Sequence, residues 1–439
     1  MFSNLTTKLL FAIAVMFPIA ATATDTNQQT PNAIATKLLD RLDAGQYDQA
    51  VADFGGEMKT AVPADRLQQV WQSLPAQFGA ATGRGQADVS KQENVTLVQI
   101  PLHYARGELV AKVAIGTDDK IIGFLIQPAP PPSAPPPSAD ADYLEIEFAV
   151  GRGEKALPGT LALPNGAGPF PAVVLVHGSG PQDRDETIGG NRPFLDLARG
   201  LAAHGIAVLR FEKRTKARPQ DFADGRYTVD DETTDDAVTA VAALAATAHV
   251  DPKRIYVLGH SQGGLMAPRI AARSQHVAGL ILLAAPARPI LDLLSEQNHY
   301  LANLDGKISP EEKTFLADLD QRIARVRGKG DVAVTDTPMN LPADYWRSVD
   351  GVDPVAEARP LPQPMLLLQG GRDMQVVAAD WQRWQSAFAN DARVSFKHYP
   401  ALNHLAIAGS GPSTLAEYNT PGHVDAGLIA DVADWIGKH

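Results

Sequence analysis

The chain has 439 residues, of which 45% are hydrophobic and 20% are charged, and this composition is typical of a folded globular protein with about two or three domains. Its 39 Lys and Arg against 50 Asp and Glu give a formal net charge of -11, which argues against a general affinity for nucleic acid or an anionic membrane. Cysteine is absent, so a thiol nucleophile, a disulfide framework and a thiolate metal site are excluded.

Residues 1–23 have the pattern of a secretory signal peptide. Lys8 precedes an apolar run from Leu9 to Ala20, and small residues follow as far as Ala23. The apolar run is shorter than the roughly 20 residues that a membrane-spanning helix needs. We therefore expect cleavage and export to the bacterial periplasm or medium, without a stable membrane span.

Residues 24–127 predict a small α+β domain. Helical periodicity is followed by strand-like runs, at 33–42, 47–54, 64–74, 95–104, 109–115 and 121–127. This order of elements resembles the nuclear-transport-factor-like domains. The side chains of Trp71, Phe78, His103 and Tyr104 are compatible with a cavity lining, but core packing is the commoner role. We assign this domain no chemistry.

Residues 128–140 predict a linker. They read PAPPPSAPPPSAD, and proline fixes φ and lacks an N–H group. Such a segment favours a stiff polyproline II conformation outside any core. It predicts a domain boundary, with a second domain from 141 to 439.

The second domain alternates short apolar runs with helical stretches. Continuous apolar runs are typical of strands buried on both faces. They lie at 172–176, 206–211, 255–258, 279–284 and 365–368, with helices predicted at 193–203 and 233–246. Such alternation predicts an α/β fold with a mostly parallel sheet covered by helices.

The strongest chemical signal is a G-x-S-x-G motif between a strand and a helix, in the segment RIYVLGHSQGG. A tight strand-to-helix turn presents Ser261 away from the sheet, and Gly259 and Gly263 make that turn sterically possible. The helix that begins at Gln262 directs its free N–H groups at developing negative charge. Ser261 is the candidate nucleophile, and the alternative is a glycine-rich packing turn.

With these motifs, the chain from about 141 to 439 resembles the α/β-hydrolase superfamily. Within it, the resemblance is to exported esterase-like members grouped with serine aminopeptidase-type hydrolases. It implies a catalytic triad in the chain order Ser, acid, His, and a helical lid inserted between two strands.

The segment VVLVHGSG is a strand followed by the turn that supplies an oxyanion donor in such hydrolases. We expect the donors to be the N–H groups of Ser179 and Gln262, with Gly178 as the alternative register. His177 is expected to shape the turn and not to act as a base. Ser179 is a weaker candidate nucleophile than Ser261, because no helix follows its turn.

The resemblance places the acid at Asp373, where a strand ends in a G-x-D turn. An acid there fixes the tautomer of the catalytic histidine. Asp380 is the competing acid, but it does not stand at a strand end.

His404, on a loop after a strand, is the candidate general base. A general base needs a pKa near working pH, as imidazole has, and a loop can bring the ring within reach of Ser261. The alternatives are His398, within the strand, and His423, which we expect to begin the last helix. The predicted triad is Ser261, Asp373 and His404.

Residues 288–361 occupy the place of the lid. Ser309 and Glu312 form a predicted capping box, with Pro at the first helical position, before a helix over 314–326. Four side chains are compatible with either the substrate pocket or lid packing: Tyr300, Met339, Tyr345 and Trp346.

The predicted activity is hydrolysis of carboxylic esters with short or medium acyl groups through an acyl-enzyme. One alternative is an aminopeptidase or amidase with the same triad, for which the acidic segment 183–186 is a candidate grip on a cationic group. Another is a non-catalytic module that binds envelope material. Motifs for nucleotide and zincin sites are absent, so no metal or organic cofactor is expected. The expected partner is a small-molecule ester or a short peptide.

Overall fold

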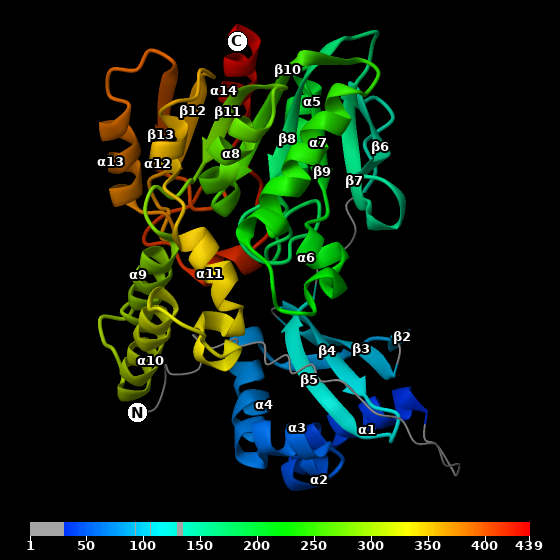
Figure 1. Cartoon of the computed structure of the whole chain (residues 1–439). Helices are drawn as coiled ribbons and strands as arrows, with labels where there is room; N and C mark the ends of the chain where they lie inside the picture. Colours follow the sequence, from blue (N-terminus) through cyan, green and yellow to red (C-terminus); the bar gives the residue numbers. More distant parts are fainter. Residues whose placement is uncertain (1–29, 93, 106, 130–134) are drawn as a thin grey trace. The chain divides into compact units, whose positions relative to one another are not determined.

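A computed structural model describes residues 30–92, 94–105, 107–129 and 135–439 of the chain (Figure 1). The predicted signal peptide, and residues 130–134 of the predicted linker, lie outside this part. The chain divides into two compact units, Met1–Pro130 and Pro131–His439, and each is described by itself.

The first unit combines four helices with a five-stranded antiparallel sheet, in the strand order β1-β3-β4-β5 with β2 paired to β3. Burial alternates along β3 and β4, so one face of the sheet packs on the helices. The elements are α1 (Pro31–Asp43), α2 (Tyr47–Ala52), α3 (Gly56–Ala61), α4 (Ala64–Phe78), β1 (Ala81–Arg84), β2 (Asp88–Gln92), β3 (Val95–Tyr104), β4 (Gly107–Ile115) and β5 (Ile121–Pro128).

Of the four side chains singled out in the first unit, all but His103 pack in or against its core. Trp71 and Tyr104 are buried in the core cluster, and Phe78 packs against it. His103 is half-exposed and contacts the carboxylate of Glu108. These contacts account for the four side chains as packing and surface residues.

The second unit is built on an eight-stranded sheet in the order β13-β12-β11-β10-β8-β9-β7-β6. Neighbouring strands from β13 to β9 are parallel, while β7 runs antiparallel to both β6 and β9. The strands are β6 (Tyr143–Val150), β7 (Leu157–Pro164), β8 (Phe170–Val176), β9 (Ala207–Phe211), β10 (Val250–His260), β11 (Val277–Leu283), β12 (Met365–Gly370) and β13 (Val394–Tyr399). The predicted α/β class with a mostly parallel sheet is confirmed.

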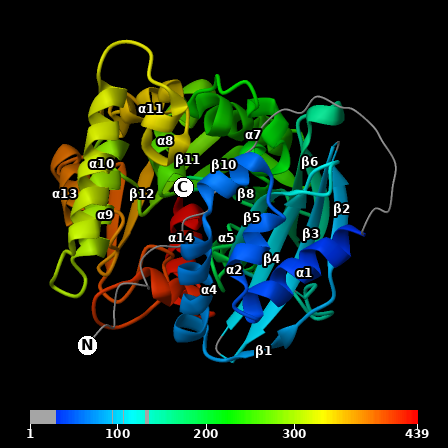
Figure 2. The same cartoon turned by 90° about the horizontal axis from the view of Figure 1, so that it is seen from below.

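Helices cover both faces of this sheet and give it two separate cores. Val174 and Val176 of β8 pack in one cluster with α7 (Asp235–Ala245) and α8 (Gln262–Arg273). Val173 and Leu175 point to the other face, into a cluster with α5 (Pro193–Ala203) and α14 (Ala426–Lys438). Figure 2 shows the central strands between these two pairs of helices. Burial on both faces explains why these strands are apolar throughout.

A helical insertion, residues 288–361, connects β11 to β12. Its elements are α9 (Ile290–Ala302), α10 (Pro310–Arg327), η4 (Val334–Asp336), η5 (Pro338–Asn340), α11 (Ala343–Asp350) and α12 (Pro354–Ala358). The predicted capping box is confirmed, because the N–H of Glu312 donates to Ser309 Oγ and the N–H of Ser309 donates to the Glu312 carboxylate. The box fixes where α10 begins.

The prediction that His423 begins the last helix is wrong. Helix α14 begins at Ala426, because the Asp425 carboxylate accepts the N–H of Leu428 and caps the helix. His423 lies before the cap, and its side chain is 88% exposed.

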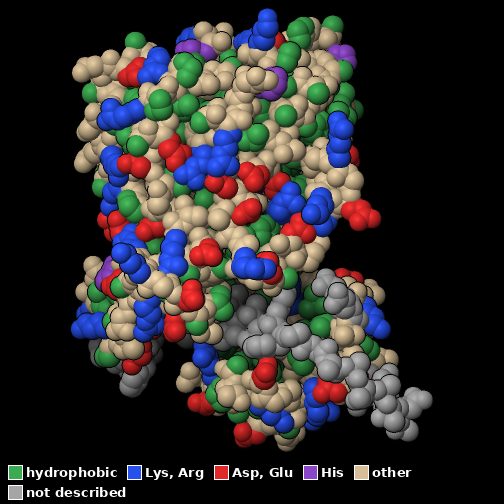
Figure 3. All heavy atoms as spheres, in the orientation of Figure 1, with side chains coloured by type: hydrophobic (Ala, Val, Ile, Leu, Met, Phe, Trp, Pro, Cys, Tyr) green, Lys and Arg blue, Asp and Glu red, His purple; other side chains and the backbone are tan. Residues whose placement is uncertain are grey.

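In the described part of the chain, no helix combines the length and the apolar composition needed to cross a membrane. On the face in Figure 3, acidic and basic side chains are interspersed. Between neighbouring helices, Arg273 of α8 forms an ion pair with Asp230 at 2.7 Å.

Candidate active site

Ser261 lies in the sharp turn between β10 and α8, with φ 52° and ψ -120°. A positive φ is strained for any residue except glycine, and such strain is typical of functional turns. The two neighbouring glycines leave no space for a side chain. A Cβ at Gly259 would lie 2.2 Å from the carbonyl oxygen of Gly263, and one at Gly263 would lie 2.0 Å from that of Val176. Both close approaches hold the turn.

Asp373 and His404 meet from the ends of neighbouring strands. The first follows β12 and the second lies on the loop after β13, and His404 Nδ1 is 2.9 Å from Asp373 Oδ2. The other oxygen, Asp373 Oδ1, accepts the N–H groups of Gln375 and Val376 at 2.8 and 2.9 Å. Both side chains of the pair are buried. The carboxylate therefore holds a proton on Nδ1 and leaves Nε2 of His404 as the basic nitrogen.

His260, the residue before Ser261, binds the loop that carries His404. Its Nε2 is 2.9 Å from the carbonyl oxygen of His404, and its Nδ1 is 2.9 Å from Oε2 of Glu186. With Glu186 ionised, both partners are acceptors, and both ring nitrogens donate at once only in the imidazolium form. Burial disfavours that charge, but the Glu186 carboxylate outweighs burial and raises the pKa of His260. This contact fixes the His404 loop beside the serine turn.

The turn after β8 packs directly against the serine turn. A Cβ at Gly178 would lie 3.3 Å from the Cβ of Ser261. The N–H of Gly178 already donates to Glu186 Oε1 at 2.7 Å, which removes Gly178 as the alternative donor. Within the described residues, the backbone N–H groups of Ser179 and Gln262 have no hydrogen-bond acceptor, and both residues line the same cavity as Ser261.

His177 supports the turn as a neutral residue. It is fully buried, packs on the rings of Phe194 and Phe211, and binds the carbonyl oxygen of Asp183 at 2.9 Å through Nε2. Burial lowers the pKa of His177 to about 4. We assign it no part in proton transfer. Its hydrogen bond to Asp183 fixes the loop that follows the turn.

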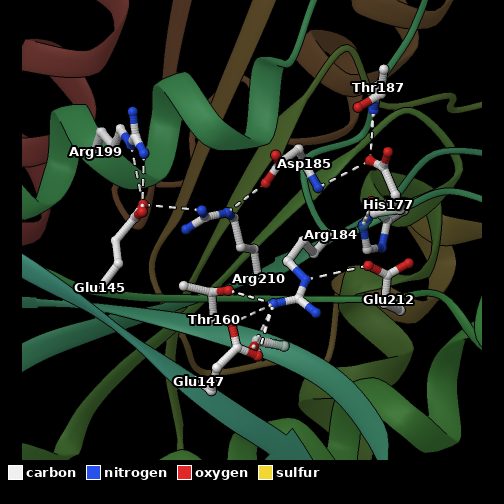
Figure 4. A network of polar contacts seen from close by, with 12 residues as sticks. Glu145, Glu147, Thr160, His177, Arg184, Asp185, Thr187, Arg199, Arg210 and Glu212 are labelled. Atoms are coloured by element: carbon white, nitrogen blue, oxygen red, sulfur yellow. Dashed lines mark hydrogen bonds and ion pairs between the residues drawn. The ribbon is translucent and has the colours of Figure 1, made fainter. Parts of the chain in front are cut away.

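The side chains of the acidic segment 183–186 form hydrogen bonds and ion pairs with other parts of the protein (Figure 4). Asp183 Oδ1 accepts two backbone N–H groups, and Asp185 contacts Arg210 at 2.7 Å. Arg184 reaches Glu147 and Glu212, each at 3.2 Å. None of the four side chains lines the cavity beside Ser261. The structure gives no support to this segment as a grip for a cationic substrate group.

A cavity of about 420 Å³ opens at Ser261, and apolar and aromatic side chains form most of its wall. Phe222 and Tyr227 contribute from the segment after β9. The insertion contributes Ile290, Leu293, Leu294, Met339, Leu341, Tyr345 and Trp346. Tyr300, which the sequence also singled out, does not line it, and its hydroxyl donates to the carbonyl oxygen of Ser413.

The competing residues have structural partners elsewhere. Asp380 is fully buried and accepts the N–H groups of Ala287 and Arg288 and the guanidinium of Arg288. His398 lies within β13, and the exposed His423 contacts Asp196. Within the described part of the chain, none of these side chains contacts Asp373 or His404.

Sequence reasoning missed Lys213 and Glu232, and it considered Glu186 only as part of the acidic segment 183–186; all three are buried beside the site. Only Lys213 carries a signal in the sequence, because it closely follows the apolar run at 206–211. Their partners lie far away along the chain, as with Lys213 Nζ, which donates to the carbonyl oxygen of Gly178 at 2.8 Å. In the residues that the structure describes, no group of three or more His, Asp or Glu is arranged to hold a metal ion.

The chain belongs to the alpha/beta hydrolase family, whose model matches residues 173–417. A second model, described as a protein of unknown function (DUF3887), matches residues 35–124. Esterase EstD of Thermotoga maritima is 35% identical over 398 residues, which cover 90% of this chain and 93% of that protein.

The similar solved structures are more distant in sequence. Est1E from Butyrivibrio proteoclasticus, with ferulic acid bound, is 16% identical, covers 66% of this chain and 98% of its own, and has a TM-score of 0.44. An esterase of Pyrococcus furiosus is 14% identical, covers 70% and 97%, and has a TM-score of 0.42.

Proposed function

We propose that the protein is a serine hydrolase that cleaves carboxylic esters with short or medium acyl groups. The observation that carries the proposal is the 2.9 Å contact of His404 with Asp373, on a loop bound to the residue before the strained Ser261. The 35% identity with an esterase over nearly the whole chain favours an ester as the substrate.

In the proposed mechanism, Ser261 Oγ attacks the ester carbonyl while Nε2 of His404 takes its proton. Asp373 stabilises the imidazolium, which then protonates the departing alcohol. The N–H groups of Ser179 and Gln262 bind the oxyanion, and one such donor typically contributes about 3 kcal/mol. Water then attacks the acyl-enzyme by the same path, releases the carboxylic acid and restores Ser261.

The cavity supports the proposed substrate size. A volume of about 420 Å³ suits a small molecule. Its largely apolar wall stabilises an acyl chain by about 0.8 kcal/mol for each buried methylene. We therefore expect apolar acyl groups of short or medium length to be preferred over polar acyl groups.

An aminopeptidase needs a carboxylate that is free to bind the substrate's amino group. Glu232 lines the cavity, but one of its oxygens contacts Lys213 at 3.2 Å and the other accepts Gln262 Nε2 at 2.8 Å. Its charge is therefore already compensated, which favours esters. Turnover of p-nitrophenyl esters and aminoacyl anilides compares the two activities, and dominant anilide turnover would contradict the proposal.

Labelling with a fluorophosphonate tests the proposed nucleophile and base. Wild-type protein should label, whereas Ser261→Ala and His404→Ala should not. His423→Ala is the matched control and should label normally, because the His423 side chain is exposed and contacts Asp196, which is not part of the proposed site. A wild-type protein that neither labels nor hydrolyses esters would instead support the binding-module alternative.

We also propose that the chain is exported and cleaved after Ala23, on the sequence pattern of residues 1–23. N-terminal sequencing of protein from the periplasm or medium should begin at Thr24. An uncleaved chain retained in the cytoplasm would contradict export.

A further inference from the structure

A buried lysine binds the peptide group that carries one of the proposed oxyanion donors. Lys213 follows β9, is 2% exposed, and donates from Nζ to the carbonyl oxygen of Gly178 at 2.8 Å. In the trans peptide between Gly178 and Ser179, the carbonyl and the N–H point in opposite directions. A cation on that carbonyl therefore directs the N–H of Ser179 away from itself, and it also polarises the peptide so that the N–H donates more strongly.

The partner of this lysine binds the residue that carries the second donor. Glu232 lies in η3 (Asp230–Thr234), a π-helical turn of the kind that is frequent at functional sites, and contacts Lys213 Nζ at 3.2 Å. Its other oxygen accepts Gln262 Nε2 at 2.8 Å. The hydroxyl of Tyr345, from the insertion, donates to Gln262 Oε1 at 3.2 Å. The Gln262 side chain is thus held from both ends.

We propose that Lys213 and Glu232 form a positioning pair for the oxyanion hole. Lys213 sets the direction of the Ser179 N–H, and Glu232 holds the first residue of α8, so that one ion pair links the two donors. This inference rests on the proposed function. Desolvation offsets most of the attraction within a buried ion pair, so such a pair is weak evidence for stability. Its contacts with the peptide group between Gly178 and Ser179 and with the Gln262 side chain give it a role in geometry.

The test separates positioning from a merely structural role by comparing two variants of the full mature chain. Lys213→Met removes the ammonium and leaves Glu232 buried and unpaired, so it lowers both Tm and kcat. The double variant Lys213→Met/Glu232→Gln leaves no unpaired charge and keeps an amide to contact Gln262. With a positioning role, the double variant recovers Tm but kcat stays about 10- to 100-fold below wild type, with KM changed less than about 3-fold.

Affinity for a boronic acid gives a second measurement, because its tetrahedral adduct places an oxygen in the oxyanion hole. In the double variant, boronate affinity should fall by a factor similar to kcat/KM, while affinity for the carboxylate product stays near wild type. Arg199→Met is the matched control. It removes an ion pair to Glu145, 3.0 Å long and remote from the cavity, and should leave kcat unchanged (Figure 4).

Recovery of kcat together with Tm in the double variant would overturn the positioning role, as would a change confined to KM. If Lys213→Met does not fold, the double variant alone decides. Failure of the proposed function has a different signature: wild-type protein itself would show neither ester turnover nor fluorophosphonate labelling, and the inference would fall with it.

Discussion

At the scale of single residues, the strain at Ser261 separates function from stability. Its φ of 52° would suit glycine, yet only serine supplies the hydroxyl. Ser261→Gly should therefore be more stable than Ser261→Ala by about 1 kcal/mol, because alanine keeps the strain and glycine relieves it. Urea unfolding of the two inactive variants measures the difference, and equal stabilities would show that the turn imposes no strain on this residue.

The pair of His260 and Glu186 gives stability a defined pH dependence. The raised pKa of His260 contributes stability that is fully present below the ordinary histidine pKa of 6.5 and is lost as pH rises through the folded pKa. Burial opposes the charge of Glu186, but His260 lowers its pKa, and this contribution is present above 4.5 and lost as pH falls. The pair therefore contributes most between about pH 4.5 and 6.5.

Glu186→Gln tests this window. Breaking a buried charged pair typically costs about 3 kcal/mol, so the variant should be less stable than wild type by about that amount near pH 6. The difference should shrink toward pH 9, because the charge of His260 is lost as pH rises through its raised folded pKa. Unfolding free energies from urea titrations at both pH values check this. A difference that does not change with pH would mean that His260 is not charged in the folded protein.

At the scale of elements, the strands that are buried on both faces are the ones that the sequence predicts well. Strands such as β8 and β12 are apolar throughout, so they were predicted within a few residues. The pair β6 and β7 was missed. Burial along β6 is only partial, its exposed positions include Glu147, and Pro158 and Gly159 interrupt β7. The antiparallel edge of the sheet is thus the part that apolar runs do not indicate.

The same limit applies to the site. Ser261, Asp373 and His404 each follow a strand, and motifs at strand ends are local patterns that a sequence displays. The contacts around them join positions such as 186 and 260, or 213 and 178, which only the closed sheet brings together. Nothing local marks Glu232, because a π-helical turn has no distinct apolar period. Supporting residues of this kind become visible only in three dimensions.

The helical insertion forms much of the cavity wall and should set the acyl-chain preference. Leu294 of α9 lines the cavity, so Leu294→Trp should fill part of it. We expect kcat/KM for an eight-carbon acyl ester to fall about 10-fold or more relative to acetate, because several methylenes lose their apolar contacts. Val334→Trp is the control in the same insertion, since Val334 is 47% exposed and does not line the cavity. Equal effects of both substitutions would exclude this wall from acyl selection.

At the scale of the whole molecule, each unit has its own core. The cluster of the first unit contains only residues 34–126, whereas the three clusters described in the second begin at Val150, Ala162 and Met374. Every residue of the proposed site, from His177 to His404, belongs to the second unit. A domain of about 300 residues is large enough to bury a stable core without help. We therefore expect the second unit to fold and to carry out the proposed chemistry without the first.

A shortened chain of residues 135–439 tests this separation. It should fold, label with a fluorophosphonate at Ser261, and hydrolyse p-nitrophenyl acetate with kcat within about 3-fold of the full mature chain, because it retains the three core clusters of the second unit and every proposed donor. Circular dichroism establishes that it has folded, and the Ser261→Ala form of the same fragment gives the background rate. A folded fragment that neither labels nor turns over substrate would assign the first unit a part in building the active site.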